Sequence, residues 1–141
     1  MTVFIDTNAL IDALDDSRPN HPLTKPIMQA MKEQSLKAVV STQSIVDAAY
    51  VCNQLNKMPL SIVRYHIGII TSIMDVCSVD KEDIQAANNS LNPDYEDSVQ
   101  LSCAARSGCD IIVSGDKELH KYTDLKVITV SQLYNSLFKQ Q

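Results

Sequence analysis

The residues of this sequence best suited to catalysis are four widely separated aspartates: Asp6, Asp47, Asp97 and Asp116. Two of them stand near the ends of apolar segments, Asp6 directly after residues 3–5 and Asp116 three residues after Val113. Carboxylates that are gathered closely repel one another, and their oxygen atoms are the ligands that Mg²⁺ and Mn²⁺ prefer. If the fold brings the four together, we expect them to hold one or two such ions and to direct an activated water at a phosphodiester.

Each aspartate taken alone also suits an ordinary structural role. Asp6 and Asp116 can cap the helices that follow them, and Asp97 stands among acids that favour the positive end of a helix dipole. Asp47 belongs to the polar stripe of its helix, where a side chain commonly faces water. Thr7 can cap a helix as well as Asp6 can, so a charge placed at the strand end explains Asp6 better. The metal-site interpretation therefore depends on all four acids meeting at one edge of the fold.

Neighbouring polar residues complete the predicted site. Asn8 and Ser114 are expected to support the ligands by hydrogen-bonding a carboxylate or a metal-bound water. Lys117 and Lys121 follow Asp116 and are candidates for contacting phosphates that flank the cut, although a solvated helix face is the commoner role of such lysines.

Other chemistries find little support in the sequence. It contains neither a GxGxxG nor a GxxxxGK[ST] motif for nucleotides, and its three histidines have no HExxH setting. The four cysteines form no CxxC pair, so we expect reduced and mostly buried thiols. Eight other aspartates are predicted to be solvated or capping groups: Asp12, Asp15, Asp16, Asp75, Asp80, Asp83, Asp110 and Asp124.

Composition and charge bound the class of protein. The 141 residues, 45% of them hydrophobic, are expected to form one domain over residues 1–141. The net charge of −5 argues against general affinity for nucleic acid. That objection is answered if several acids are metal ligands, because each divalent ion cancels two negative charges and attracts phosphate. No stretch approaches the roughly 20 apolar residues of a membrane span and no export leader is evident, so a soluble, cytoplasmic protein is predicted.

The elements that must position these acids alternate along the chain. Short apolar, partly β-branched runs predict strands, and apolar residues at helical spacing, such as Ile45, Ala48, Ala49 and Cys52, predict helices. Strands are predicted at residues 3–5, 37–40, 76–79, 109–113 and 125–129. Helices are predicted from residue 9, at about 23–34, 42–56, 59–74, from 80, at 94–107, after 116 and at 130–138. This alternation indicates a three-layer α/β/α fold with a mostly parallel central sheet, in which ligands bind beyond the carboxyl ends of the strands.

Four segments in order resemble the motifs of the PIN domain family, in the branch of the VapC-type toxin nucleases. Residues 3–12, VFIDTNALID, resemble the family's first strand and its DTN signature. Residues 41–50, STQSIVDAAY, are similar to the second motif, whose acid is more often glutamate, so Asp47 reaches one methylene less far. Residues 96–100, EDSVQ, and 109–116, CDIIVSGD, resemble the third and fourth motifs. Gly115 occupies a position where family members often carry a basic residue.

The resemblance spans nearly the whole chain. It implies a three-layer fold, dependence on Mg²⁺ or Mn²⁺, cleavage of RNA and a homodimer. It also implies an antitoxin protein that blocks the site in many members of the family. The four motif acids correspond here to Asp6, Asp47, Asp97 and Asp116.

Two other interpretations remain open at this point. A PIN-fold module that has lost turnover would serve as an RNA-binding or assembly partner, and retention of all four acids argues against it. A phosphoacceptor domain with Asp6 as nucleophile would need a second acid beside Asp6, where Asn8 stands instead, and Lys117 is the only suitable lysine.

Overall fold

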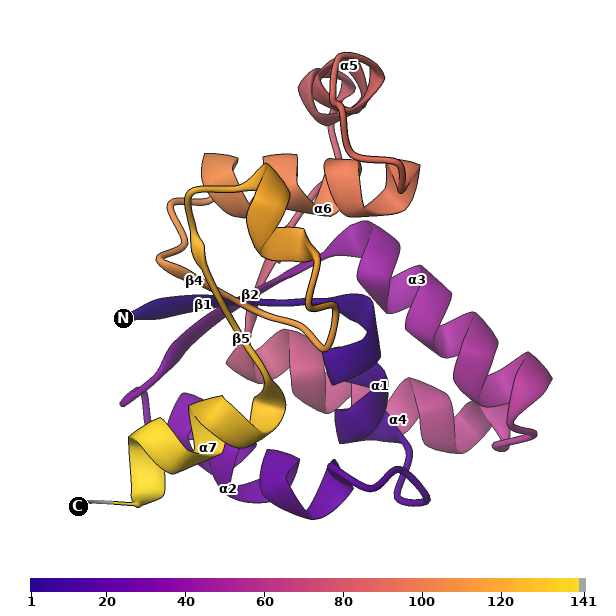
Figure 1. Ribbon diagram of the computed structural model, residues 1–141. Helices are drawn as coiled ribbons and strands as arrows, with labels where there is room; N and C mark the ends of the chain where they lie inside the picture. Colours follow the sequence, from indigo (N-terminus) through magenta and orange to yellow (C-terminus); the bar gives the residue numbers. More distant parts are fainter. Residues whose placement is uncertain (140–141) are drawn as a thin grey trace.

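The computed structural model describes residues 1–139, in which strands and helices alternate (Figure 1). The strands are β1 (Thr2–Ile5), β2 (Lys37–Ser41), β3 (Asp75–Cys77), β4 (Ile111–Val113) and β5 (Lys126–Ile128). The α-helices are α1 (Thr7–Leu14), α2 (His21–Lys32), α3 (Thr42–Tyr50), α4 (Leu60–Ile73), α5 (Lys81–Asn88), α6 (Tyr95–Arg106) and α7 (Val130–Phe138). A π-helical segment, η1 (Val51–Leu55), continues α3, and a 3₁₀-helix, η2 (Leu119–Tyr122), lies between β4 and β5.

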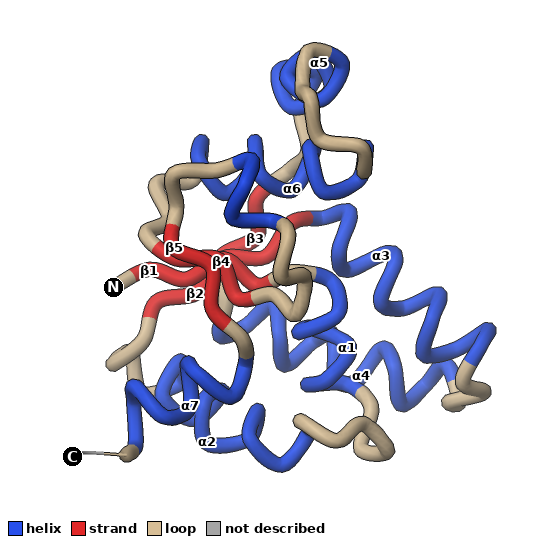
Figure 2. The backbone as a smooth tube through the Cα atoms, viewed as in Figure 1, coloured by secondary structure: helices blue, strands red, loops and turns tan. Residues whose placement is uncertain are grey.

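The five strands run parallel in one sheet, in the order β3-β2-β1-β4-β5. Figure 2 shows the strands in red, gathered between helices. β1 lies at the centre, where Phe4 pairs with Val39 of β2 on one side and Ile112 of β4 on the other. The chain builds outward from β1 to β3 and then returns to the opposite side of β1 for β4 and β5. The carboxyl ends of β1 and β4 therefore flank the point where the strand order reverses, which is where open α/β sheets bind ligands.

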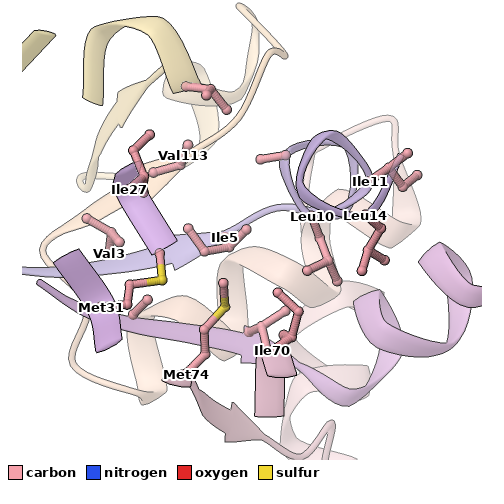
Figure 3. Close-up of a cluster of buried hydrophobic side chains, with 14 of the residues drawn as sticks. Val3, Ile5, Leu10, Ile11, Leu14, Ile27, Met31, Ile70, Met74 and Val113 are labelled. Atoms are coloured by element: carbon pink, nitrogen blue, oxygen red, sulfur yellow. The ribbon is translucent and has the colours of Figure 1, made fainter. Parts of the chain in front are cut away.

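Alternate side chains of each strand enter two hydrophobic cores. Val3, Ile5 and Val113 face the larger core, which the helices α1, α2, α4 and α7 complete (Figure 3). Phe4 and Ile112 face the smaller core, which is closed mainly by α6 and also by α5. Helices thus cover both faces of the sheet, as Figure 1 shows, and the expected three-layer α/β/α fold is confirmed.

The long helix predicted over residues 42–56 changes geometry partway along. Asn56 N donates to Val51 O at 2.9 Å and Met58 N to Cys52 O at 2.9 Å, so the last turns are wider than those of an α-helix. The predicted buried face is nevertheless correct, because Ala48 and Cys52 are both buried. Gly108 ends α6 as expected, with a φ of 70° that an L side chain rarely adopts. None of the helices within residues 1–139 has the length and apolar content that crossing a bilayer requires.

Three aspartates expected to be solvated or capping groups are instead buried, namely Asp12, Asp15 and Asp83. Each is compensated by polar partners, since a buried charge without them would be costly. Asp12 accepts a hydrogen bond from Arg18, Asp15 from Ser17, and Asp83 from Arg106. Asp83 also completes the predicted capping of α5 by accepting from Asp80 N at 2.8 Å. All four cysteines are buried and free, as expected.

Candidate functional site

Asp6 connects the central strand to the first helix. It is the N-cap of α1, and its Oδ1 accepts a hydrogen bond from Thr7 N at 2.8 Å. Its Oδ2 accepts from Ser114 Oγ at 2.7 Å, at the end of β4. Burial raises the pKa of Asp6; the bonds from Ser114 and Thr7 oppose that rise, and the negative charges of Asp116 and Asp94 add to it. Asp6 therefore serves both as a cap and as a carboxylate held among other acids.

The turn after β4 brings Asp116 to the same place. Ser114 is buried, and its hydroxyl accepts a hydrogen bond from Asp116 N at 3.1 Å while donating to Asp6. Asp116 Oδ1 in turn accepts from Glu118 N at 2.9 Å. One buried hydroxyl thus fixes the relative position of two acidic residues, and the role of Ser114 in supporting metal ligands stays a prediction.

The start of α6 supplies the third predicted aspartate together with an unpredicted neighbour. Asp94 is the N-cap of α6, and its Oδ1 accepts a hydrogen bond from Asp97 N at 3.0 Å. Burial, a hydrogen bond with Asp116 and the nearby charges of Asp94, Asp6 and Asp116 raise the pKa of Asp97 to about 7. Burial is the largest cause of this rise, and the charges of Asp94, Asp6 and Asp116 add to it.

These acids line a cavity of about 700 Å³ at the carboxyl ends of β1 and β4. Its walls include Asp6, Asp94, Asp97 and Asp116. The loop between α1 and α2 closes another side of it with Arg18, Pro19 and Asn20. Sequence reasoning missed Asp94, because an acid at a helix start is usually only a cap, and it missed Arg18, because nothing in the local sequence places that loop over the strand ends.

Asp47 lies beside this cluster in a separate acidic pair. Its Oδ1 accepts a hydrogen bond from Gln43 Nε2 at 2.9 Å, and within the described residues it does not line the cavity. Its nearest acidic neighbour is Glu96: burial, a hydrogen bond with Asp47 and the charges of Asp47, Asp94 and Asp6 raise the pKa of Glu96 to about 7. The structure therefore brings three of the four predicted aspartates onto one cavity and places the fourth next to it. The role of Asp47 as a metal ligand stays a prediction.

The remaining predicted residues have different surroundings. Asn8 is exposed and lines the cavity, and its backbone oxygen accepts a long hydrogen bond of 3.5 Å from Arg18 Nη2. Lys117 is exposed beside Asp116 on a neighbouring hollow of about 330 Å³. Lys121 forms an ion pair with Glu118, which competes with any contact that it makes to a phosphate. Their predicted contacts with RNA stay predictions.

A buried polar network beneath the cavity joins the three helices that carry the acids. Gln100 of α6 accepts a hydrogen bond from Ser41 Oγ at 2.7 Å and donates to Thr7 Oγ1 at 3.2 Å. Its amide also contacts Ser44 Oγ, which lies 2.8 Å from Thr7 Oγ1. Because Thr7 follows Asp6 and Gln100 lies one turn after Asp97, this network fixes the spacing between those two acids.

The donor set of the cavity fits a hard divalent cation. Its walls carry several carboxylates, and burial together with the neighbouring negative charges raises the pKa values of Asp6 and Asp97. A bound cation would favour the ionised forms of both groups. In residues 1–139, no three His, Cys, Asp or Glu side chains converge tightly enough in their present conformations to enclose an ion.

The sequence comparisons identify the family of this chain. The PIN domain model matches residues 2–118, so the chain belongs to the PIN domain family. Ribonuclease VapC1 of Aquifex aeolicus (strain VF5) is 24% identical to this chain over 135 residues, which cover 92% of this chain and 91% of that protein.

Solved structures share the fold at lower identity. VapC20 of Mycobacterium tuberculosis, a toxin that cleaves the sarcin-ricin loop, matches with a TM-score of 0.65 and 10% identity over 87% of this chain and 98% of that one. VapBC2 of Rickettsia felis, solved with a DNA fragment from its promoter, matches with a TM-score of 0.68 and 13% identity. The match covers 92% of this chain and 98% of that one. PAE2754 of Pyrobaculum aerophilum matches with a TM-score of 0.66 and 18% identity, over 99% of this chain and 97% of that one.

Proposed function

We propose that this protein is a divalent-metal-dependent endoribonuclease, the toxin of a toxin-antitoxin pair. The observation that carries the proposal is the meeting of Asp6, Asp97 and Asp116 on one cavity at the switch point of the sheet, with the pKa of Asp97 raised to about 7. The similarity to ribonuclease VapC1 along nearly the full length of both chains supports RNA as the substrate.

Within this proposal, some residues of the cavity bind the metal and others position those ligands. Asp6, Asp97 and Asp116 would hold Mg²⁺ or Mn²⁺, one ion or two, with Asp94 beside them and Asp47 joining from α3. A bound cation supplies a Lewis acid that activates water and stabilises the leaving oxygen of the phosphodiester. Ser114 keeps Asp6 oriented through the bond of 2.7 Å, and the Gln100 network holds α6 at a fixed distance from α1. Asn8 is in position to hydrogen-bond a ligand or the substrate from the cavity wall.

Partners follow from the same assignment. Neutralisation of the acids by divalent ions would let a chain of net charge −5 accept an RNA strand, with Lys117 near the flanking phosphates. A protein antitoxin covering the cavity would keep the nuclease silent, and the relatives' VapBC complex supports such a partner. We further propose a homodimer that acts in the cytoplasm.

The test is cleavage of a mixed RNA pool by purified, antitoxin-free protein in Mg²⁺ or Mn²⁺. D6N, D97N and D116N are expected to lower the rate by more than about a hundredfold, because even residues that only orient metal ligands contribute 10–100-fold. D47N is expected to cost less, since Asp47 lies outside the cavity lining. D75N, at the exposed start of β3, is the matched control.

Two results would overturn the assignment. Cleavage that persists in EDTA or in D6N would exclude the metal site described above. A folded wild-type protein that binds RNA but cleaves none with any divalent ion would favour the non-catalytic RNA-binding module.

A further inference from the structure

Arg18 places a cation in the wall of the acidic cavity. It lies in the loop between α1 and α2, whose backbone is fixed on both sides: Arg18 N donates to Asp15 O at 3.2 Å and His21 N donates to Arg18 O at 3.0 Å. The side chain lines the same cavity as Asp6, Asp97 and Asp116.

Asp12 forms an ion pair with the Nε side of this guanidinium. Arg18 Nε donates to Asp12 Oδ1 at 2.9 Å, and Asp12 is only 8% exposed. The backbone oxygen of Asp12 is 2.9 Å from His21 Nδ1, which ties the end of α1 to the start of α2. The anchored guanidinium is thus oriented rather than free to swing, and the Asp12–Arg18 pair carries no net charge that would neutralise the metal-binding acids.

A comparison with Arg106 shows what the anchoring of Arg18 leaves available. The two side chains are equally exposed, at 33%. Arg106 uses all three of its nitrogens, with Asp83, Asp80, Ser78 O and Cys77 Sγ as partners, and so has a structural role. Arg18 Nη2 makes only a long contact of 3.5 Å to Asn8 O, and within residues 1–139 its Nη1 donates to no protein acceptor.

We propose that Arg18 binds a phosphate of the RNA strand next to the one that is cut. A guanidinium presents parallel N–H groups that match two phosphate oxygens, and the edge of Arg18 that carries Nη1 and Nη2 is the edge left open. The divalent ions at the aspartates would hold the cleaved phosphate, and a cation elsewhere in the cavity wall suits the neighbouring phosphate. This inference rests on the proposed function, and it assigns the phosphate-binding role to a residue other than Lys117 or Lys121.

The experiment compares the wild type with R18Q in two measurements. Binding of a short single-stranded oligoribonucleotide is followed by fluorescence anisotropy in Ca²⁺ across a series of KCl concentrations. R18Q is expected to weaken binding about tenfold, as for a lost charge-assisted hydrogen bond, and to reduce the slope of log Kd against log salt by about 0.7, the value for one phosphate contact on a single strand. In cleavage assays KM is expected to rise with kcat nearly unchanged.

Matched variants separate this role from a structural one. R64Q, which removes an exposed arginine on α4, is expected to keep both the wild-type Kd and its salt slope. R18K keeps the charge but lacks the planar guanidinium, so it is expected to weaken binding about threefold and to leave the slope of log Kd against log salt unchanged. R18K replaces R18Q in both measurements if R18Q does not fold.

The outcomes distinguish the two proposals. The role of Arg18 would be overturned if R18Q kept the Kd and the salt slope of the wild type, or if a folded R18K kept the wild-type Kd. Either result would leave the proposed nuclease function standing. A wild-type protein that neither binds nor cleaves RNA would instead overturn the proposed function on which this inference rests.

Discussion

The hydroxyl of Ser114 donates a hydrogen bond of 2.7 Å to Oδ2 of Asp6, although 108 residues separate the two along the chain. The bond joins the carboxyl ends of the two central strands and acts on chemistry as well as on structure. Burial raises the pKa of Asp6, and the bond from Ser114 is the largest influence that opposes the rise. Ser114 therefore favours the ionised form of Asp6, which the proposed role of Asp6 as a metal ligand requires.

Removing this hydroxyl should shift the pH dependence of cleavage. In S114A the pKa of Asp6 is expected to rise further, so the acidic limb of the pH–kcat profile moves to higher pH and the rate at neutral pH falls about tenfold. S136A, which removes a hydroxyl that donates to Leu133 O within α7 at 2.8 Å, is the control. A profile in S114A that overlays the wild type would contradict this role.

The metal-free protein is expected to lose stability as pH rises. The pKa values of Asp97 and Glu96 lie near 7 in the folded state and near 4 in the unfolded chain, so the folded protein binds more protons between these values. The stabilisation present at low pH is thus lost as pH rises through 7, by about 1–2 kcal/mol after allowance for solvent screening.

Thermal melts in EDTA between pH 5 and 8 measure this loss. D97N should show a flatter dependence on pH, because its amide does not titrate. Added Mg²⁺ should stabilise the protein more at pH 8 than at pH 5, since binding requires ionised carboxylates. A melting temperature that rises with pH in EDTA would contradict the raised pKa values.

Asp83 should be the most important acid for stability, although it lies on the other face of the sheet from α1. It is fully buried; burial opposes its ionisation, but hydrogen bonds from Arg106, Asp80 N and Ser102 hold its pKa well below the usual range. D83N is expected to lower the free energy of unfolding by about 2–3 kcal/mol, because it removes the buried anion from Arg106. Urea unfolding measures the change, and D80N, at the exposed partner of Arg106, should cost less than about 1 kcal/mol.

Gln100 is expected to couple stability to activity. In Q100L the hydroxyls of Ser41, Ser44 and Thr7 lose their shared partner, which should cost about 1–3 kcal/mol of stability. Because the network fixes α6 relative to α1, kcat should fall while KM stays within about threefold. Q85L, on the outer helix α5, is the matched control, and a stable Q100L with wild-type kcat would exclude the positioning role.

Periodicity and apolar runs predicted the strands, nearly every helix and the parallel sheet, because these depend on patterns that local sequence carries. The convergence of Asp6, Asp97 and Asp116 followed from the rule that parallel strands end at one edge. The buried aspartates escaped prediction, since Asp12 and Asp83 are compensated by arginines whose pairing depends on tertiary packing. The separation of Asp47 from the cavity depends on side-chain length and helix placement, which sequence spacing does not resolve.

The position of β1 between β2 and β4 has a consequence for synthesis of the protein. Phe4 of β1 pairs with Ile112 of β4. The hydrogen-bonding edge of β1 that faces β4 therefore has no partner strand until nearly four fifths of the chain has been translated. Ser114 and Asp116 follow directly, and only then can the cavity close around Asp6. Such distant pairing slows folding and leaves the nascent chain without its acidic centre. Under the proposed function, a chain still on the ribosome would therefore lack nuclease activity until its last strands are added.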